Sequence, residues 1–157
     1  PVLNKVLGIQ DENGMILEKL EELEKLLGND VVLVSVMTAN NETGSIQDVE
    51  KIAQMAHKYG AYFHTDATQA IGKMAISCKK WGIDFLSCSA HKFYGPKGVG
   101  VLYAKSGVPF APYIHGGEQE KGRRAGTYNT SDIYGLGVAA ELAKKNLNEK
   151  IFILILP

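Results

Sequence analysis

A hydroxyl, an imidazole and an amine stand close together where an apolar run of the chain ends. The run covers 84–89 and closes with Ser89, and His91 and Lys92 follow where Gly95 then opens a loop. In parallel α/β sheets, ligands bind at the carboxyl ends of the strands, so chemistry is expected here. A lysine there can form a Schiff base with a carbonyl compound if its amine is reachable and uncharged. An isolated lysine would be a solvated surface charge, so its neighbours decide the interpretation.

Two other polar segments supply an acid and amide side chains. Asp66 and Gln69 follow one short apolar run, and Asn41 lies in the polar segment behind another. Pyridoxal phosphate (PLP) needs a lysine for the Schiff base and an acid opposite its pyridine nitrogen, because a protonated ring accepts electrons from a carbanion. Asp66 alone could be a helix cap, with Gln69 as its hydrogen-bonded neighbour. The combination of Asp66, Gln69 and Lys92 favours a PLP site.

The common nucleotide and metal motifs are absent. Gly72-Lys73 is followed by Met74 and not by Ser or Thr, so there is no phosphate-binding P-loop. The glycines after Lys92 do not satisfy GxGxxG, because Tyr103 stands where the last glycine should be. This argues against a Rossmann dehydrogenase. Neither HExxH nor a paired metal-ligand spacing occurs, so we expect no bound metal.

Alternating extended and helical segments must position these groups. Strands are predicted at 31–37, 61–65, 84–89 and 99–104, and helices at 17–27, 48–59, near 77–81 and at about 131–147, with a loop-rich segment at 105–129. This rhythm predicts an α/β fold with a mainly parallel or mixed sheet flanked by helices. The polar segments then meet at one rim of the sheet. That rim would bring together Asn41, Asp66, Gln69, Ser89, His91 and Lys92.

Composition describes an ordinary globular chain of 157 residues, 45% hydrophobic and 22% charged. Seventeen basic and seventeen acidic residues balance, so no global field favours nucleic acid or an anionic membrane. The longest apolar run, 151–156, is far shorter than the roughly 20 residues that span a bilayer. Cys78 and Cys88 fit neither a disulfide framework nor a zinc site, which suggests a reducing compartment. With no signal peptide, we expect a cytoplasmic protein.

Four segments together resemble the NifS-like cysteine desulfurases, a group of class V, fold-type I PLP enzymes that includes selenocysteine lyases. They are MTANNETG at 37–44, HTDATQ at 64–69, SCSAHKFYGPKG at 87–98, and 116–127 with GGEQE at its start and RAGT at its end. The likeness runs from roughly residue 10 to residue 145, with the motifs in the family's order and spacing. It implies the central part of the PLP-binding large domain.

The resemblance assigns roles around the cofactor ring. Lys92 would hold PLP as a Schiff base and later move protons at the substrate α-carbon. Asp66 would pair with the pyridinium nitrogen. Gln69 and Asn41 would hydrogen-bond the phenolic oxygen of the cofactor.

The resemblance also assigns a phosphate site. Ser89 and His91 would hold the phosphate within the subunit. Thr127 would reach the phosphate of the partner subunit in a homodimer, and Arg124 would support that interface.

The implied activity is removal of sulfur from L-cysteine, giving alanine and an enzyme persulfide for iron–sulfur cluster assembly or other sulfur transfer. Sulfur-acceptor or iron–sulfur scaffold proteins would then be partners. Two alternatives stay open. The chain could belong to a selenocysteine lyase, acting on L-selenocysteine, or to another class V lyase or aminotransferase. It could also be a truncated, non-catalytic fold module.

Parts of the family's active site have no match here. The family's catalytic cysteine and its arginine for the substrate carboxylate come downstream of this region, and Cys78 and Cys88 both precede the cofactor lysine. We therefore expect 1–150 to be a partial large domain, without its N-terminal part and the small C-terminal domain. An atypical apolar tail follows at 151–157. By itself this segment should be inactive.

Overall fold

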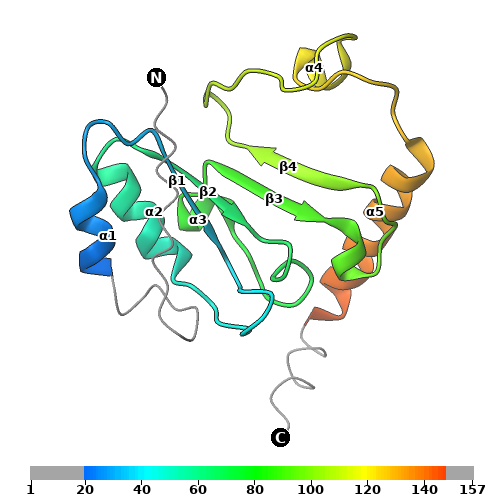
Figure 1. Ribbon diagram of the computed structural model, residues 1–157. Coiled ribbons are helices and arrows are strands. Elements are labelled where there is room, and N and C mark those ends of the chain that lie inside the picture. Colours follow the sequence, from blue (N-terminus) through cyan, green and yellow to red (C-terminus); the bar gives the residue numbers. More distant parts are fainter. Residues whose placement is uncertain (1–19, 148–157) are drawn as a thin grey trace, which may run out of the picture.

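Four strands form one sheet in the order β1-β2-β3-β4 in the computed structural model, which describes residues 20–147 (Figure 1). β1 (Leu33–Met37), β2 (Tyr62–Asp66) and β3 (Phe85–Ser89) run parallel, and β4 (Gly100–Ala104) runs antiparallel to β3. Helices flank the sheet. The predicted α/β fold with a mainly parallel sheet is confirmed.

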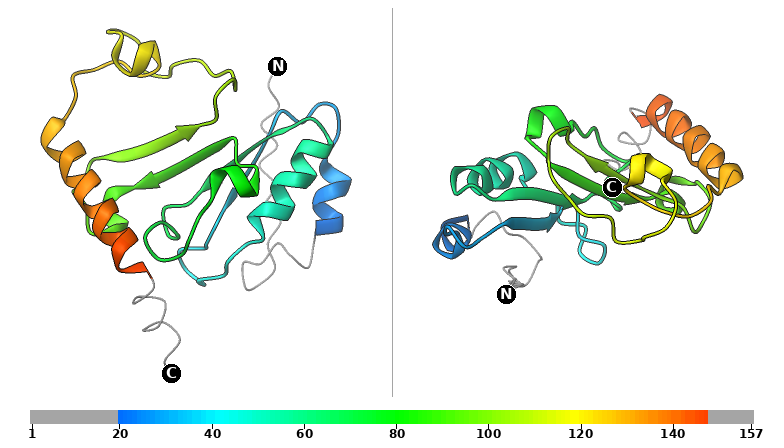
Figure 2. Two further views of the ribbon diagram at one scale, coloured as in Figure 1. Left: turned by 180° about the vertical axis from the view of Figure 1, so that it is seen from behind. Right: turned by 90° about the horizontal axis from the view of Figure 1, so that it is seen from above.

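The helices pack on different parts of the sheet (Figure 2). They are α1 (Leu20–Leu26), α2 (Val49–Lys58), α3 (Cys78–Trp81), the 3-10 helix η2 (Ala90–Phe93), α4 (Gln119–Gly122) and α5 (Thr130–Lys145). α2 packs against β1 and β2 and beside α3, whereas α5 packs against η2. The helix that carries Lys92 is therefore braced by the C-terminal helix of the described chain.

α2 joins the sheet through one apolar stripe. Asp48 begins the helix, because its side chain accepts the N–H of Lys51 at 3.2 Å. The predicted stripe is buried, and it consists of Val49, Ile52, Ala53 and Ala56. It packs in one core with Phe63 of β2 and Ile83. Burying an apolar side chain of the size of Phe63 contributes about 1.5–3 kcal/mol, so this contact anchors β2.

β2 and β3 each alternate between a buried and a half-buried residue. Successive side chains of a strand point to opposite faces, so Phe63 and Thr65 face the core while His64 and Asp66 share the other face. The acid at the end of β2 thus stands on the face turned away from the α2 core.

The predicted strands and the helices at 48–59, 77–81 and 131–147 all lie within two residues of their expected limits. Two segments differ. Lys92 lies in η2 and not in a loop, because the carbonyl of Ala90 accepts the N–H groups of Tyr94 and Gly95. Tyr94, with φ 68°, then ends this helical turn. The short helix α4 interrupts the segment that was expected to be loop-rich.

Several predictions extend beyond the described residues. These are the limits of the partial domain 1–150, the apolar tail 151–157 and the first turn of the helix predicted at 17–27. Between residues 20 and 147, none of the helices combines the length and hydrophobicity needed to span a bilayer.

Candidate functional site

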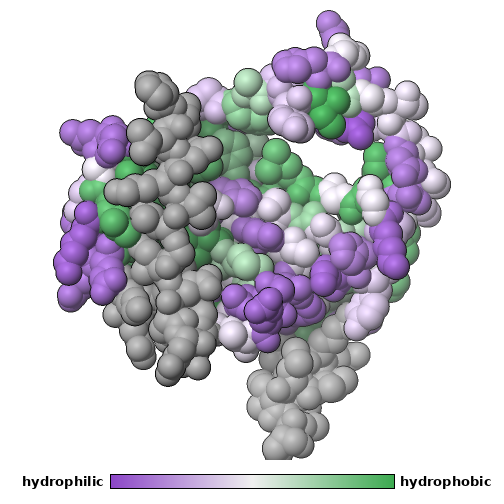
Figure 3. Space-filling model, viewed as in Figure 1, coloured by the Kyte–Doolittle hydropathy of each residue, from purple (hydrophilic) through white to green (hydrophobic). Residues whose placement is uncertain are grey.

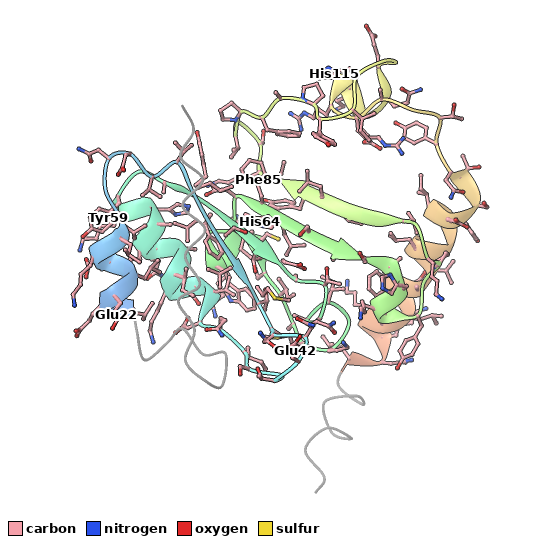
Figure 4. The ribbon with its side chains drawn as sticks, viewed as in Figure 1. Glu22, Glu42, Tyr59, His64, Phe85 and His115 are labelled. Carbon is pink, nitrogen blue, oxygen red and sulfur yellow. The ribbon has the colours of Figure 1, made fainter. Side chains whose placement is uncertain are left out.

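The carboxyl ends of the three parallel strands form one rim. Met37, Asp66 and Ser87 are aligned across β1, β2 and β3, so these strands end at a common level. Asn41 lies in the turn after β1, close to Glu42, which marks this rim in Figure 4. Ser89 is the last residue of β3. The elements that carry the predicted residues therefore converge as expected for an α/β site.

Asp66 is held in place by its own turn. The N–H of Thr68 donates to Oδ1 of Asp66 at 2.8 Å, and the backbone carbonyl of Asp66 accepts the N–H of Thr38 at 2.9 Å. The side chain thus supports the following turn, but this turn is not a helix, so Asp66 is not the helix cap of the alternative interpretation. A carboxylate has two oxygens and about four lone-pair sites, so it can still accept a ring N–H.

Gln69, Lys73 and Lys92 form a second group at the rim. The segment after β2 forms consecutive turns, in which the carbonyl of Ala67 accepts the N–H of Ile71 at 2.8 Å and that of Ala70 accepts the N–H of Lys73 at 3.0 Å. Gln69 Oε1 accepts a hydrogen bond from Lys73 Nζ at 3.1 Å. Burial and, to a smaller extent, the charge of Lys92 lower the pKa of Lys73. Lys92 itself is exposed, so its amine can be reached from solvent.

Gly72 allows the turn after β2 to approach η2. Its φ is +73°, in the left-handed region that favours glycine. A Cβ on Gly72 would lie 2.9 Å from Cβ of Phe93 and 3.1 Å from Cβ of Ala143. Phe93 directly follows Lys92 and is buried. The glycine therefore sets how closely this turn approaches the helical turn that carries Lys92.

Ser89 and His91 flank the buried Ala90 at the start of η2. Ser89 is half-buried and His91 is exposed. The N–H of Ala90 donates to the carbonyl of Val99 at 3.1 Å, which fixes the start of the helical turn on the β4 side. The predicted hydroxyl and imidazole are therefore placed beside Lys92.

The turn that carries Asn41 is organised by the preceding residue. Asn40 Oδ1 accepts the N–H of Glu42 at 2.8 Å and the N–H of Thr43 at 3.0 Å. Such Asx turns hold a short polar loop in one conformation. Asn41 is exposed at the tip of this loop.

Thr127 lies away from the rim. It is exposed in the segment between α4 and α5, which is part of the arch of chain at 105–129 between β4 and α5. His115, also on this arch, lies at the opposite end of the molecule from Glu42 (Figure 4). The space-filling view shows an opening bordered by this arch, β4 and α5 (Figure 3). Thr127 thus belongs to a segment separate from the turns that carry the other six predicted residues.

His64 makes contacts that the sequence did not predict. Its Nδ1 lies 2.7 Å from Ser35 Oγ of β1, and its Nε2 lies 3.1 Å from Ser87 Oγ of β3. Burial lowers the pKa of His64, although the nearby charge of Asp66 acts in the opposite direction. A neutral imidazole thus links three strands beside the acid. In the sequence, the position of His64 beside Asp66 is indicated by their spacing, because residues two apart in a strand lie on the same face.

Neither cysteine has the surroundings of a reactive thiol. Cys78 is half-buried and Cys88 is buried, and burial raises the pKa of both thiols. The thiolate is the reactive form, so a raised pKa makes both cysteines poor nucleophiles at neutral pH.

Among residues 20–147, no three His, Cys, Asp or Glu side chains are grouped so that they could hold a metal ion.

A family model describes almost the whole chain. The model for aminotransferase class-V matches residues 5–151. The chain belongs to the aminotransferase class-V family. The sequence-based prediction of the cysteine desulfurase group within it is confirmed by the curated relatives and the solved structures.

Two curated relatives illustrate the likeness. The chain is 61% identical over 124 residues to a cysteine desulfurase of Sinorhizobium fredii, covering 79% of this chain and 32% of that protein. It is 51% identical over 140 residues to the cysteine desulfurase IscS of Clostridium botulinum, covering 89% of this chain and 35% of that protein. The chain thus spans about a third of the length of these relatives.

Solved structures share the fold. A NifS-like protein superposes with a TM-score of 0.81 at 51% identity, over 83% of this chain and 36% of its own. SspA in complex with cysteine superposes with a TM-score of 0.79 at 38% identity, over 91% of this chain and 43% of its own.

Proposed function

We propose that this chain is the cofactor-anchoring part of a PLP-dependent cysteine desulfurase. The observation that carries the proposal is the rim itself: Asp66 ends β2 and Lys92 follows β3, in a chain 61% identical to a cysteine desulfurase. Because the chain spans about a third of that relative, we take it to be the central part of a longer enzyme.

The residues at the rim fit the chemistry of PLP. The exposed amine of Lys92 can attach covalently to its aldehyde, and Asp66, fixed by Thr68, can keep the pyridine nitrogen protonated. Ser89 and His91 offer a hydroxyl and an imidazole for its phosphate. When bound, the cofactor supplies an electron-accepting ring that stabilises negative charge on a substrate carbon.

Each residue then has a defined task. Lys92 would hold the cofactor and would move a proton at the substrate α-carbon. Asp66 would preserve the positive charge of the ring, and Gln69 and Asn41 would bind the phenolic oxygen. The N–H of Thr68 keeps the Asp66 carboxylate from turning away.

The proposed substrate is L-cysteine, which SspA, a structure neighbour, holds in its complex. Since both thiols of this chain have a raised pKa, the thiol that accepts the sulfur comes from another part of the enzyme. We infer that the sulfur passes on to an acceptor protein, as for iron–sulfur cluster assembly, and that the enzyme works in the cytoplasm.

A homodimer would complete the site with Thr127. The arch that carries Thr127 exposes large apolar side chains, among them Tyr113, which is 95% exposed, and Tyr128. Tyr134 on α5 is also exposed, to 76%. Such a surface next to an opening supports contact with a second copy.

The test uses the full-length enzyme that carries this segment. Wild type should bind PLP with visible absorbance and release sulfide from L-cysteine, while Lys92→Ala should lose both. Lys97→Ala, which removes an exposed lysine from the loop before β4, is the matched control and should keep both. Selenide release from L-selenocysteine with none from L-cysteine would instead identify a selenocysteine lyase. A wild-type enzyme without cofactor absorbance would refute the proposal.

A further inference from the structure

The contact between Lys73 and Gln69 fixes the orientation of an amide. Lys73 Nζ lies 3.1 Å from Oε1 of Gln69. A lysine ammonium has three donors and no acceptor, so the amide atom that faces it must be the oxygen. The NH2 group of Gln69 therefore stands on the opposite side of the amide.

This orientation matters for the role proposed for Gln69. The phenolic oxygen of PLP accepts hydrogen bonds when it is ionised, so Gln69 must present a donor to it. With the amide reversed, two oxygens would face each other and repel. An amide alone has two nearly equivalent orientations, and Lys73 selects the one that donates.

The backbone holds Lys73 at the distance that this contact needs. Gln69 and Lys73 are four residues apart in the consecutive turns after β2, where the carbonyl of Ala70 accepts the N–H of Lys73 at 3.0 Å and the left-handed Gly72 lies between the two residues. Gly72 brings that turn against Phe93, beside Lys92. Half-burial of Lys73 limits the competition of water for its ammonium group.

We propose that Lys73 is a positioning residue, which holds the Gln69 amide so that its NH2 group donates to the phenolic oxygen of the bound cofactor. The inference rests on the proposed function. It assigns to Lys73 no contact with the reacting atoms of the substrate.

The experiment measures PLP binding to the cofactor-free, full-length enzyme by visible absorbance. Lys73→Met should raise the dissociation constant about two- to tenfold, because only part of the amide population is then in the donating orientation. Lys73→Arg, which keeps the donors and the charge, should restore most of the affinity. Lys79→Met removes an exposed lysine on α3 and should change nothing.

A double-mutant cycle separates orientation from simple charge attraction. In a Gln69→Leu background, Lys73→Met should cause no further loss of affinity. An equal loss in both backgrounds would show that Lys73 acts through its charge alone and would overturn the inference. Unchanged binding by Lys73→Met would overturn it too.

The melting temperature of each cofactor-free variant checks the fold. If Lys73→Met lowers it, Lys73→Ala replaces that variant in the cycle. Wild type that binds no PLP would refute the proposed function, whereas wild type that binds PLP equally well with and without Lys73 would refute only this inference.

Discussion

His57 Nε2 lies 2.6 Å from Oδ2 of the buried Asp84, at the start of β3 and away from the candidate site. The same oxygen accepts the N–H of Phe63 at 2.9 Å, and Lys105 Nζ lies 3.3 Å from Oδ1. The carboxylate thus ties α2, β2 and the end of β4 together. It stabilises the end of the sheet opposite the rim.

This cluster predicts a loss of stability in acid. Burial would raise the pKa of Asp84, but the bonds from Phe63, His57 and Lys105 outweigh it and lower that pKa. A lowered folded-state pKa means that the stabilisation is present above the unfolded value, about 3.9, and is lost as pH falls further. Asp84→Asn should lower the free energy of unfolding at neutral pH by about 1–3 kcal/mol.

Urea unfolding between neutral and acid pH measures this. Asp84→Asn should also flatten the fall in stability below about pH 4. Asp30→Asn, at an exposed aspartate before β1, should keep the wild-type fall. An Asp84→Asn variant whose stability falls as steeply as wild type would contradict the assignment.

The link made by His64 predicts a second pH effect, at higher pH. Because its folded-state pKa is lowered, the unfolded chain binds a proton first as pH drops below about 6.5. Stability should therefore decrease from neutral pH toward pH 5, before the Asp84 cluster titrates. His64→Gln should remove this part of the pH dependence.

His115→Gln is the control, because His115 is exposed on the arch. It should leave the pH dependence unchanged. Should His64→Gln retain the decrease between neutral pH and pH 5, another group would be responsible for it.

Gly72 predicts a link between backbone conformation and cofactor binding. Gly72→Ala combines left-handed strain with a 2.9 Å approach to Phe93, and should destabilise the protein by about 1–3 kcal/mol. Since Phe93 adjoins Lys92, PLP binding should weaken as well. Gly98→Ala separates the two causes, because Gly98 has φ +82° and no atom within 4 Å of the added Cβ.

Thermal unfolding and PLP titration of both variants test this. Gly98→Ala should lose stability through strain alone and keep more of its affinity for PLP. Equal loss of affinity in the two variants would show that contact with Phe93 is not what positions Lys92.

The strands could be predicted because each is a short apolar run that ends in polar residues. The shared rim of Asp66, Ser89 and Lys92 follows from parallel pairing alone. The helical turn η2 could not be predicted, because it depends on backbone bonds to the carbonyl of Ala90. The alternation of His64 with Asp66 gives a face but not the register that brings Ser35 opposite.

The contacts of Lys73 at the candidate site could not be predicted from the sequence either. Its spacing from Gln69 is visible in the sequence, but the contact depends on the turns between the two residues, with φ +73° at Gly72. Its proximity to Lys92 further requires Gly72 to pack on Phe93, a residue of another segment. Contacts between distant segments depend on packing, and spacing along the chain does not encode packing directly.

The antiparallel pairing of β3 with β4 bears on the order in which the site forms. β3 and β4 are joined by a short connection, and Lys92 lies inside it. Closing a short connection costs less chain entropy than closing the longer crossovers between parallel strands. The β3–β4 pairing around the lysine segment can therefore form early, before α5 and the turn at Gly72 pack against it. The Asp66 segment must wait for a long-range crossover to close.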